Sequence, residues 1–154
     1  MIILNKIIDQ IPTEGINLTV ALTADERQKP KQKLTKENVT IKLDLARGMV
    51  IQEGDILSDE METFLVQITA QPEKVMTIIS NDKLDLMKAC YHLGNRHISL
   101  EINDRYLRFS ADHVLQSMLM KLGLNVIEET APFYPVTGAD HHHSSLGFAE
   151  KLQS

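Results

Sequence analysis

The 154-residue sequence has one cysteine, no tryptophan and no apolar run long enough to cross a bilayer. A single thiol, Cys90, cannot form an internal disulfide, and it cannot build a thiolate zinc site without ligands from another chain. A bilayer-spanning helix needs about 20 consecutive apolar residues, whereas Lys6 and Asp9 interrupt the short apolar stretch at the start. We therefore expect a cytoplasmic protein whose metal chemistry rests on histidine and carboxylate.

An excess of positive charge is also missing. The net charge is −5, and it is spread evenly: residues 1–70 carry 8 basic and 11 acidic side chains, and residues 71–154 carry 8 and 10. Without a basic patch we expect neither nucleic acid nor an anionic membrane as a partner. The sequence lacks the H-E-x-x-H, G-x-S-x-G and G-x-x-x-x-G-K-[ST] patterns of common catalytic sites. We therefore do not expect an enzyme.

Three segments of the first 70 residues alternate apolar and polar side chains, which is typical of half-buried strands. The apolar positions are Ile16, Leu18, Val20 and Leu22, then Val39, Ile41, Leu43 and Leu45, then Phe64, Val66 and Ile68. Turn signals at Gly48 and at Gly54-Asp55 separate them. We expect a small antiparallel β domain over residues 1–70. The Lys-rich stretch around Pro30 could be a partner-binding edge, but a solvated loop is the simpler interpretation.

Beyond residue 70 the patterns follow the order β-α-β-β-α-β. Strand patterns cover residues 75–79, 97–102, 106–109 and 124–127. The first helix pattern begins at Asn81-Asp82, has Leu84, Met87 and Tyr91 on one apolar stripe and ends at Gly94. This order predicts a ferredoxin-like domain over residues 71–130 and an α+β fold overall.

The second helix pattern follows Ser110, which we expect to be its N-cap, with Asp112 in the first turn. Its expected buried positions are Val114, Leu115, Met118, Leu119 and Leu122. From Ala131 onward the chain has Pro132, Pro135 and two glycines but no amphipathic period. We expect residues 131–154 to form a flexible tail that carries a histidine run.

All six histidines fall in the second half of the sequence. Imidazole is a common ligand for nickel, copper and zinc. His97 begins a strand pattern whose buried face would be Ile98, Leu100 and Ile102, so His97 should point outward. The same pattern fits a surface histidine without function. A lone imidazole cannot hold a metal ion, but a twofold dimer would place two copies opposite each other.

Other histidines offer further ligands. His141, His142 and His143 form a run in the expected tail, and short His tracts are a compositional signal for metal binding. They could also be coincidental. His92 and His113 lie in helix patterns, where structural roles are the simpler interpretation, although His113 follows Asp112 and could serve as a secondary ligand.

The string Tyr91-His92-Leu93-Gly94-Asn95-Arg96-His97 resembles the signature of the urease accessory nickel chaperone family, UreE type. The likeness continues through Asp112-His113-Val114-Leu115, Leu122-Gly123-Leu124 and Ala131-Pro132-Phe133, and more loosely through Asp44-Leu45-Ala46-Arg47-Gly48 and Gly54-Asp55-Ile56-Leu57 in the first domain. It covers nearly the whole sequence and is strongest over residues 72–139.

The resemblance implies a homodimer joined through the ferredoxin-like domains, an N-terminal domain suited to protein or peptide binding, and nickel at the interface. It makes His97 the central ligand from each subunit, with the tail histidines completing the shell. It also implies delivery of Ni(II) to apo-urease together with other accessory proteins, including a GTPase, and metal could drive dimers to pair. Imidazole sites also accept zinc and copper.

Two other functions stay open at this point. A cytoplasmic nickel or zinc buffer would use the same ligands without a specific acceptor. A metal-dependent hydrolase would need about three fixed protein ligands and a general base, and no local spacing supplies them.

Overall fold

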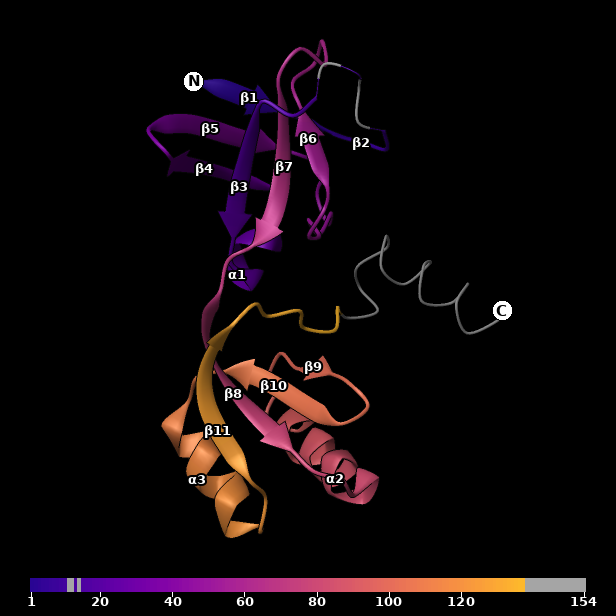
Figure 1. Ribbon diagram of the computed structural model, residues 1–154, viewed down its shortest axis with the longest axis vertical. Helices are drawn as coiled ribbons and strands as arrows, with labels where there is room; N and C mark the ends of the chain where they lie inside the picture. The colour runs from indigo at the N-terminus through magenta and orange to yellow at the C-terminus, as the bar shows by residue number, and fades with distance from the viewer. Residues whose placement is uncertain (11–12, 14, 138–154) are drawn as a thin grey trace, which may run out of the picture. The chain divides into compact units, whose positions relative to one another are not determined.

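A computed structural model describes residues 1–137 with the exception of residues 11, 12 and 14. The described chain divides into two compact units, Met1–Ala70 and Gln71–Val136. Together these units hold 11 strands and three helices within the described residues (Figure 1). The longest of these helices has 12 residues, so no helix of the described chain is long and apolar enough to cross a membrane.

The first unit consists of two sheets whose facing sides share one core. One sheet has the strand order β1-β5-β4, with β1 at Ile2–Leu4, β5 at Val39–Asp44 and β4 at Lys31–Lys36. The other has the order β2-β6-β7-β3, with β2 at Lys6–Ile8, β6 at Ile56–Ser58, β7 at Leu65–Ala70 and β3 at Leu18–Leu22. Alternate residues of five of these strands, among them Leu4, Val20, Ile41, Leu57 and Val66, form a common buried cluster.

The three predicted strands are confirmed as β3, β5 and β7, and most strand pairs of this unit are antiparallel. Two pairs are parallel, β1 with β5 and β3 with β7. In each pair, the chain between the two strands passes through the other sheet before it returns. The solvated-loop interpretation of the Lys-rich stretch is wrong: Lys31–Lys36 is the edge strand β4, with Lys31 and Lys33 exposed.

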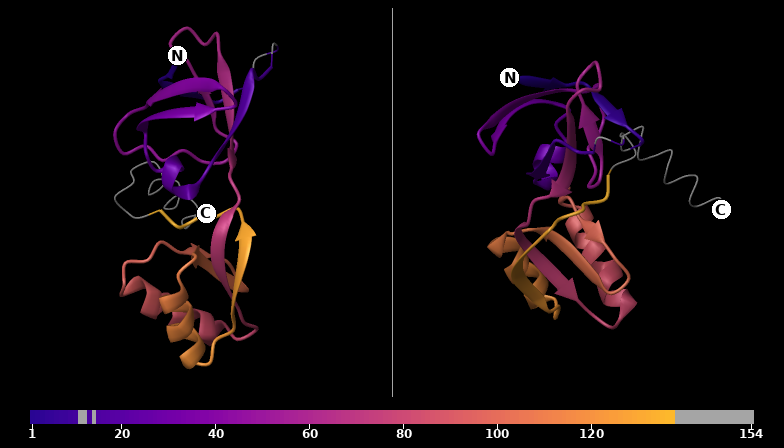
Figure 2. Two further views of the ribbon diagram at one scale, coloured as in Figure 1. Left: turned by 90° about the vertical axis from the view of Figure 1, so that its left-hand side faces the viewer. Right: turned by 45° about the horizontal axis from the view of Figure 1, so that its top comes forward.

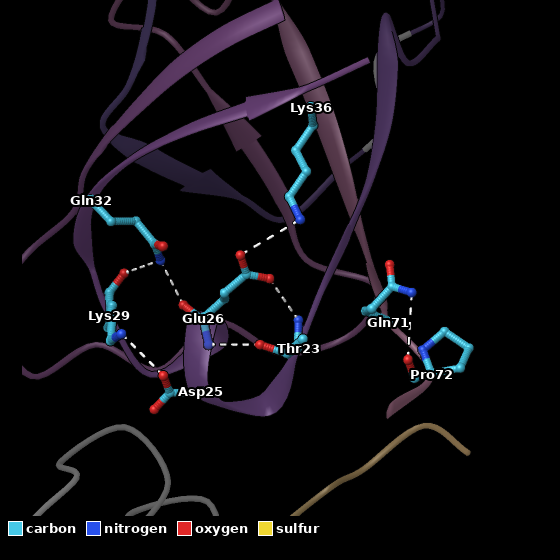
Figure 3. Close-up of polar contacts among 8 residues, drawn as sticks. All are labelled: Thr23, Asp25, Glu26, Lys29, Gln32, Lys36, Gln71 and Pro72. Carbon is cyan, nitrogen blue, oxygen red and sulfur yellow. Dashed lines mark hydrogen bonds and ion pairs between the residues drawn. The ribbon is translucent and has the colours of Figure 1, made fainter. Parts of the chain in front are cut away.

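A short helix, α1 at Ala24–Arg27, connects β3 to β4. Thr23 and Glu26 form a capping box, in which the Thr23 hydroxyl oxygen accepts from the Glu26 N–H and the Glu26 carboxylate accepts from the Thr23 N–H (Figure 3). The same carboxylate lies 3.5 Å from the Lys36 Nζ of β4. One side chain therefore both begins the helix and holds it against the sheet.

The second unit is ferredoxin-like, as the sequence predicts. Its elements are β8 at Glu73–Ile79, α2 at Lys83–Gly94, β9 at Glu101–Ile102, β10 at Tyr106–Ser110, α3 at His113–Lys121 and β11 at Val126–Ala131. The sheet order is β11-β8-β10-β9, with every neighbouring pair antiparallel. Each helix thus joins two strands that are separated by a third, which defines the split βαβ arrangement.

Both helices cover one face of this sheet (Figure 2). Met76, Ile78, Leu107, Phe109 and Val126 project from that face and pack against Leu86, Ala89, Leu93, Leu115 and Leu119 of the helices. The predicted stripe of Leu84, Met87 and Tyr91 does share one side of α2, but its expected burial is wrong, because that side is exposed. Val114 of α3 and its C-cap Leu122, both expected to be buried, are also exposed.

Two boundaries differ from the sequence prediction. Asp112, not Ser110, is the N-cap of α3, since its carboxylate accepts from the Leu115 N–H at 3.0 Å. Residues 131–136 belong to the second unit instead of beginning a flexible tail: Ala131 ends β11, and the N–H groups of Tyr134 and Val136 donate to Glu101 and to the Leu100 carbonyl. Residues 138–154 of the predicted tail lie outside the described residues.

Candidate metal centre

His97 lies in the turn that ends α2. The N–H of His97 donates to the Gly94 carbonyl at 3.0 Å, and the N–H of Ile98 donates to the Leu93 carbonyl at 3.2 Å. These two bonds make the Schellman motif, which ends a helix with one residue in the left-handed conformation. His97 is that residue, with φ of 57°. Histidine is among the few non-glycine residues enriched in that conformation.

The predicted strand at His97 is therefore wrong, although the predicted exposure of His97 is confirmed. The strand β9 covers only Glu101 and Ile102, and their burial reverses the expected alternation: Glu101 is buried and Ile102 is exposed. A backbone turn, not a sheet, thus fixes the direction in which the imidazole leaves the fold.

The end of α2 is a favourable place for a cation. The carbonyl groups of the last helical turn carry a partial negative charge that attracts positive charge. The guanidinium of Arg96 already uses one of them, since its Nη1 donates to the His92 carbonyl at 2.9 Å. A metal ion held by His97 would lie near the same end of the helix.

An exposed apolar stripe on α2 leads toward this turn. Leu84, Met87 and Tyr91 are 53%, 64% and 67% exposed. They are spaced three and four residues apart and therefore share one side of the helix. The Tyr91 ring also meets the His92 ring edge to face, with centroids 5.5 Å apart. This side of α2 has no packing partner among the described residues of its own unit.

His113 is the first residue of α3 and is exposed. Its Nε2 lies 3.5 Å from the Glu128 carboxylate, and its Nδ1 lies 3.2 Å from the Gln116 side-chain oxygen. His113 and Glu128 together present one imidazole and one carboxylate on the surface of the second unit. A third ligand does not join them within the described residues.

His92 and Cys90 belong to the last two turns of α2 and are half-buried. Cys90 packs against the core of the second unit. Burial raises the pKa of the Cys90 thiol above its ordinary value. The protonated thiol is a poor metal ligand, in agreement with a site built from imidazole.

Within residues 1–10, 13 and 15–137, no three histidine, cysteine, aspartate or glutamate side chains gather into a metal site. The remaining predicted ligands, His141, His142 and His143, lie outside the described residues. The structure does describe the segment that leads to them, and that segment is fixed to the sheet.

The group that fixes this segment to the sheet was not predicted from the sequence. Glu101 is only 4% exposed, and its carboxylate accepts from the backbone N–H of Tyr134 at 2.9 Å and from the Asn103 amide at 2.9 Å. Arg108 lies beside it, with Nη1 at 3.8 Å. Only the alternation that places Glu101 and Arg108 on one sheet face could have suggested this pair.

Arg108 is the centre of this polar group. Its Nε donates to the Thr77 hydroxyl at 3.1 Å, its Nη2 lies 3.4 Å from the Glu129 carboxylate, and its guanidinium lies over the Tyr106 ring. Together with Glu101, these residues come from the four strands β8, β9, β10 and β11 and share the sheet face opposite the helices. One arginine between two carboxylates offsets the cost of burying Glu101.

The described residues thus define an α+β protein of two units, in which a ferredoxin-like unit displays a histidine at a helix end. Residues 4–71 match the family model of the UreE urease accessory protein N-terminal domain, and residues 73–151 match that of its C-terminal domain. The chain belongs to the UreE urease accessory protein family and has a role in urease assembly.

Individual relatives carry the same name. The urease accessory protein UreE of Nostoc sp. is 43% identical over 144 residues, which cover 93% of this chain and 98% of the relative. The UreE proteins of Nostoc punctiforme and Pseudomonas putida (strain GB-1) are 46% and 42% identical, over 84% and 90% of this chain and 89% and 85% of the relatives.

Proposed function

We propose that this chain is a metallochaperone that binds Ni(II) and delivers it to apo-urease while the urease active site is assembled. The observation that carries the proposal is the exposed His97, held in a left-handed turn at the C-terminal end of α2, in a protein of the urease accessory family. The ion is cargo, so the site must release it as well as bind it. Zinc and copper would also bind these ligands, because imidazole does not select nickel by itself.

The functional unit in this proposal is a homodimer joined through the second unit. A single imidazole is one ligand, and twofold symmetry places two copies of the same residue opposite each other. In this proposal a second copy of this chain packs on the exposed stripe of Leu84, Met87 and Tyr91. The stripe supports this arrangement because it ends six residues before His97, which lies in the turn at the end of the same helix. Two dimers could pair further around added metal.

The tail histidines His141, His142 and His143 supply the remaining ligands. An ion held by two imidazoles at a dimer seam stays open on one side, and additional ligands from the tail would close that side reversibly. His113 is an auxiliary ligand in this scheme, with Glu128 beside it. The acceptors are the urease apoprotein and other urease accessory proteins, including a GTPase, in the cytoplasm.

Transfer from the loaded protein tests the proposal against the alternative of a metal buffer. The protein is loaded with radioactive nickel, freed of excess metal and mixed with apo-urease and its other accessory proteins in the presence of a chelator that removes free nickel. A metallochaperone should pass nickel to urease under these conditions, and the His97→Asn variant should not. Loss of all nickel to the chelator would contradict delivery and favour a buffer.

A further inference from the structure

Residues 132–136, which we call the crossing segment, form a brace across the sheet of the second unit (Figure 1). The segment starts at β11, one edge of the sheet, where Ala131 pairs with Glu73 of β8. It ends where the N–H of Val136 donates to the Leu100 carbonyl at 2.8 Å, next to β9 at the opposite edge. The three strand spacings between these edges amount to about 14 Å, and five positions of extended chain span at most about 17 Å. The crossing segment is therefore nearly fully extended and has little slack.

Glu101 of β9 fastens the crossing segment at a second point. It is only 4% exposed, and its Oε1 accepts from the Tyr134 N–H at 2.9 Å. Its Oε2 accepts from the Asn103 amide at 2.9 Å and lies 3.8 Å from the Arg108 Nη1. Burial of a carboxylate is costly unless it is paired and hydrogen-bonded, and here both conditions are met. The N–H groups of Tyr134 and of Val136, two positions apart, thus both bond to the β9 side, as in an added edge strand.

The turn that carries His97 adjoins the part of the chain that the crossing segment holds. Among the described residues of the second unit, His97 is the one non-glycine residue with a positive φ, 57°. A left-handed residue other than glycine costs free energy, and it persists only where the surrounding structure fixes it. The end of α2 fixes His97 on one side, through the N–H of His97 on the Gly94 carbonyl and the N–H of Ile98 on the Leu93 carbonyl.

The other side of His97 depends on the crossing segment. The side chains of Ile98 and Leu100 pack on the core, but the backbone of residues 98–100 does not pair with β10. Apart from the bond to the helix end, the Val136 N–H supplies the only backbone hydrogen bond of residues 98–100 within the described chain. The next residue is Glu101, which holds the same segment through Tyr134.

We propose that Glu101 is a positioning residue for His97. It fastens the crossing segment against β9, and thereby keeps His97 in the left-handed conformation in which the imidazole is presented to nickel. Glu101 does not itself touch the metal. This inference rests on the proposed function, and it adds to it a residue whose contribution passes through the backbone.

The effect of Glu101 on nickel affinity should be counted twice in the proposed homodimer. When the binding-competent conformation is only partly populated, the apparent Kd rises by the reciprocal of that fraction. Each subunit would contribute one His97 to the ion, so a twofold loss of this conformation in each subunit predicts a rise of Kd of about fourfold.

The test removes either end of one hydrogen bond from the full-length chain. Tyr134→Pro lacks the N–H that Glu101 accepts, the matched control Tyr134→Phe keeps it, and Glu101→Ala removes the acceptor. Hydrogen exchange at the Val136 amide reports release of the crossing segment. Exchange at the Ile98 amide and the scalar coupling between the amide and α protons of His97, which follows φ, report the turn. Calorimetric titration with nickel chloride gives the Kd.

We expect Tyr134→Pro and Glu101→Ala to speed exchange at Val136 and Ile98, to change the His97 coupling and to raise the nickel Kd about fourfold. Tyr134→Phe should change none of these quantities. The rise in Kd should be the same when His141, His142 and His143 are all replaced by Asn, because the effect acts through His97.

Faster exchange at Val136 with an unchanged His97 coupling, or with an unchanged nickel Kd, would overturn the inference. Unchanged exchange at Val136 in both Tyr134→Pro and Glu101→Ala would overturn it too, as would a rise in Kd that disappears in the Asn background. Failure of the proposed function gives a different result: no nickel binding by the natural sequence, or the same nickel Kd in His97→Asn.

Discussion

The backbone N–H of Val136 donates to the carbonyl oxygen of Leu100, three positions after His97. This bond joins parts of the chain that are 36 positions apart. It places the turn that carries the candidate ligand and the root of the histidine-bearing tail in one folded unit. Substitutions that alter the packing of this unit should therefore affect metal binding. Substitutions at exposed positions leave the packing unchanged, so a loss of metal binding at such a position indicates the loss of a ligand.

The stripe on α2 gives a prediction about assembly. Met87→Glu should weaken the proposed homodimer at least tenfold, because a twofold interface would carry the buried charge twice and burial of an unpaired charge is costly. The fold should be unchanged, since Met87 is exposed in the single chain. Val114→Glu is the matched control on α3, where Val114 is 80% exposed. Sedimentation at several concentrations gives both dissociation constants.

The same helix shows why periodicity could predict the helix but not its buried face. The series Leu84, Met87 and Tyr91 and the series Leu86, Ala89 and Leu93 both recur at helical spacing. The first series has the larger side chains, yet the second packs on the sheet. Which side faces the core depends on the path of the chain into and out of β8, and that information does not lie within the helix.

Substitution of one leucine on each side of α2 tests which side of the helix packs on the sheet. Leu93 is fully buried, and Leu93→Ala should lower the free energy of unfolding by about 2 to 5 kcal/mol, through lost apolar burial and the cavity that remains. Leu84→Ala on the exposed side should change it by less than about 0.5 kcal/mol. Urea denaturation measures both, and equal losses would mean that the sides of the helix are assigned wrongly.

Asp59 gives a prediction about acid stability of the first unit. Its carboxylate accepts from the Thr63 hydroxyl and from the N–H groups of Thr63 and Phe64, in the turn between β6 and β7. Those bonds, the Thr63 hydroxyl first, hold the pKa of Asp59 below its ordinary value of 3.8. Because the folded state binds this proton less readily than the unfolded chain, the stabilisation is present above pH 3.8 and is lost as pH falls below it.

Asp59→Asn should therefore destabilise the protein at pH 7, and the difference from the natural sequence should shrink as pH falls to about 3, as followed by urea denaturation at each pH. Asp9→Asn, at an exposed position of the same unit, is the control. A difference that stays constant over this range would mean that the charge of Asp59 does not stabilise the turn.

The candidate site was predicted in part. The sequence identified His97 and its exposure, but the alternation of Ile98, Leu100 and Ile102 imitates a strand where the chain forms a Schellman turn. The role of Glu101 could not be predicted, because its partners Arg108 and Tyr134 are brought to it by a hairpin and by a segment that crosses the sheet. In the first unit, β4 was missed because alternating lysines in an edge strand resemble a charged loop.

Nickel titration of the natural sequence and of His97→Asn, with the mass of each species measured in parallel, tests the central claim most directly. Asparagine tolerates the left-handed conformation at this position and so removes the imidazole with little strain. The natural sequence should bind one tight nickel ion per dimer, and His97→Asn should lose that site while remaining a folded dimer. His113→Asn is the control and should keep the tight site. Equal nickel affinity of His97→Asn and the natural sequence would contradict the account.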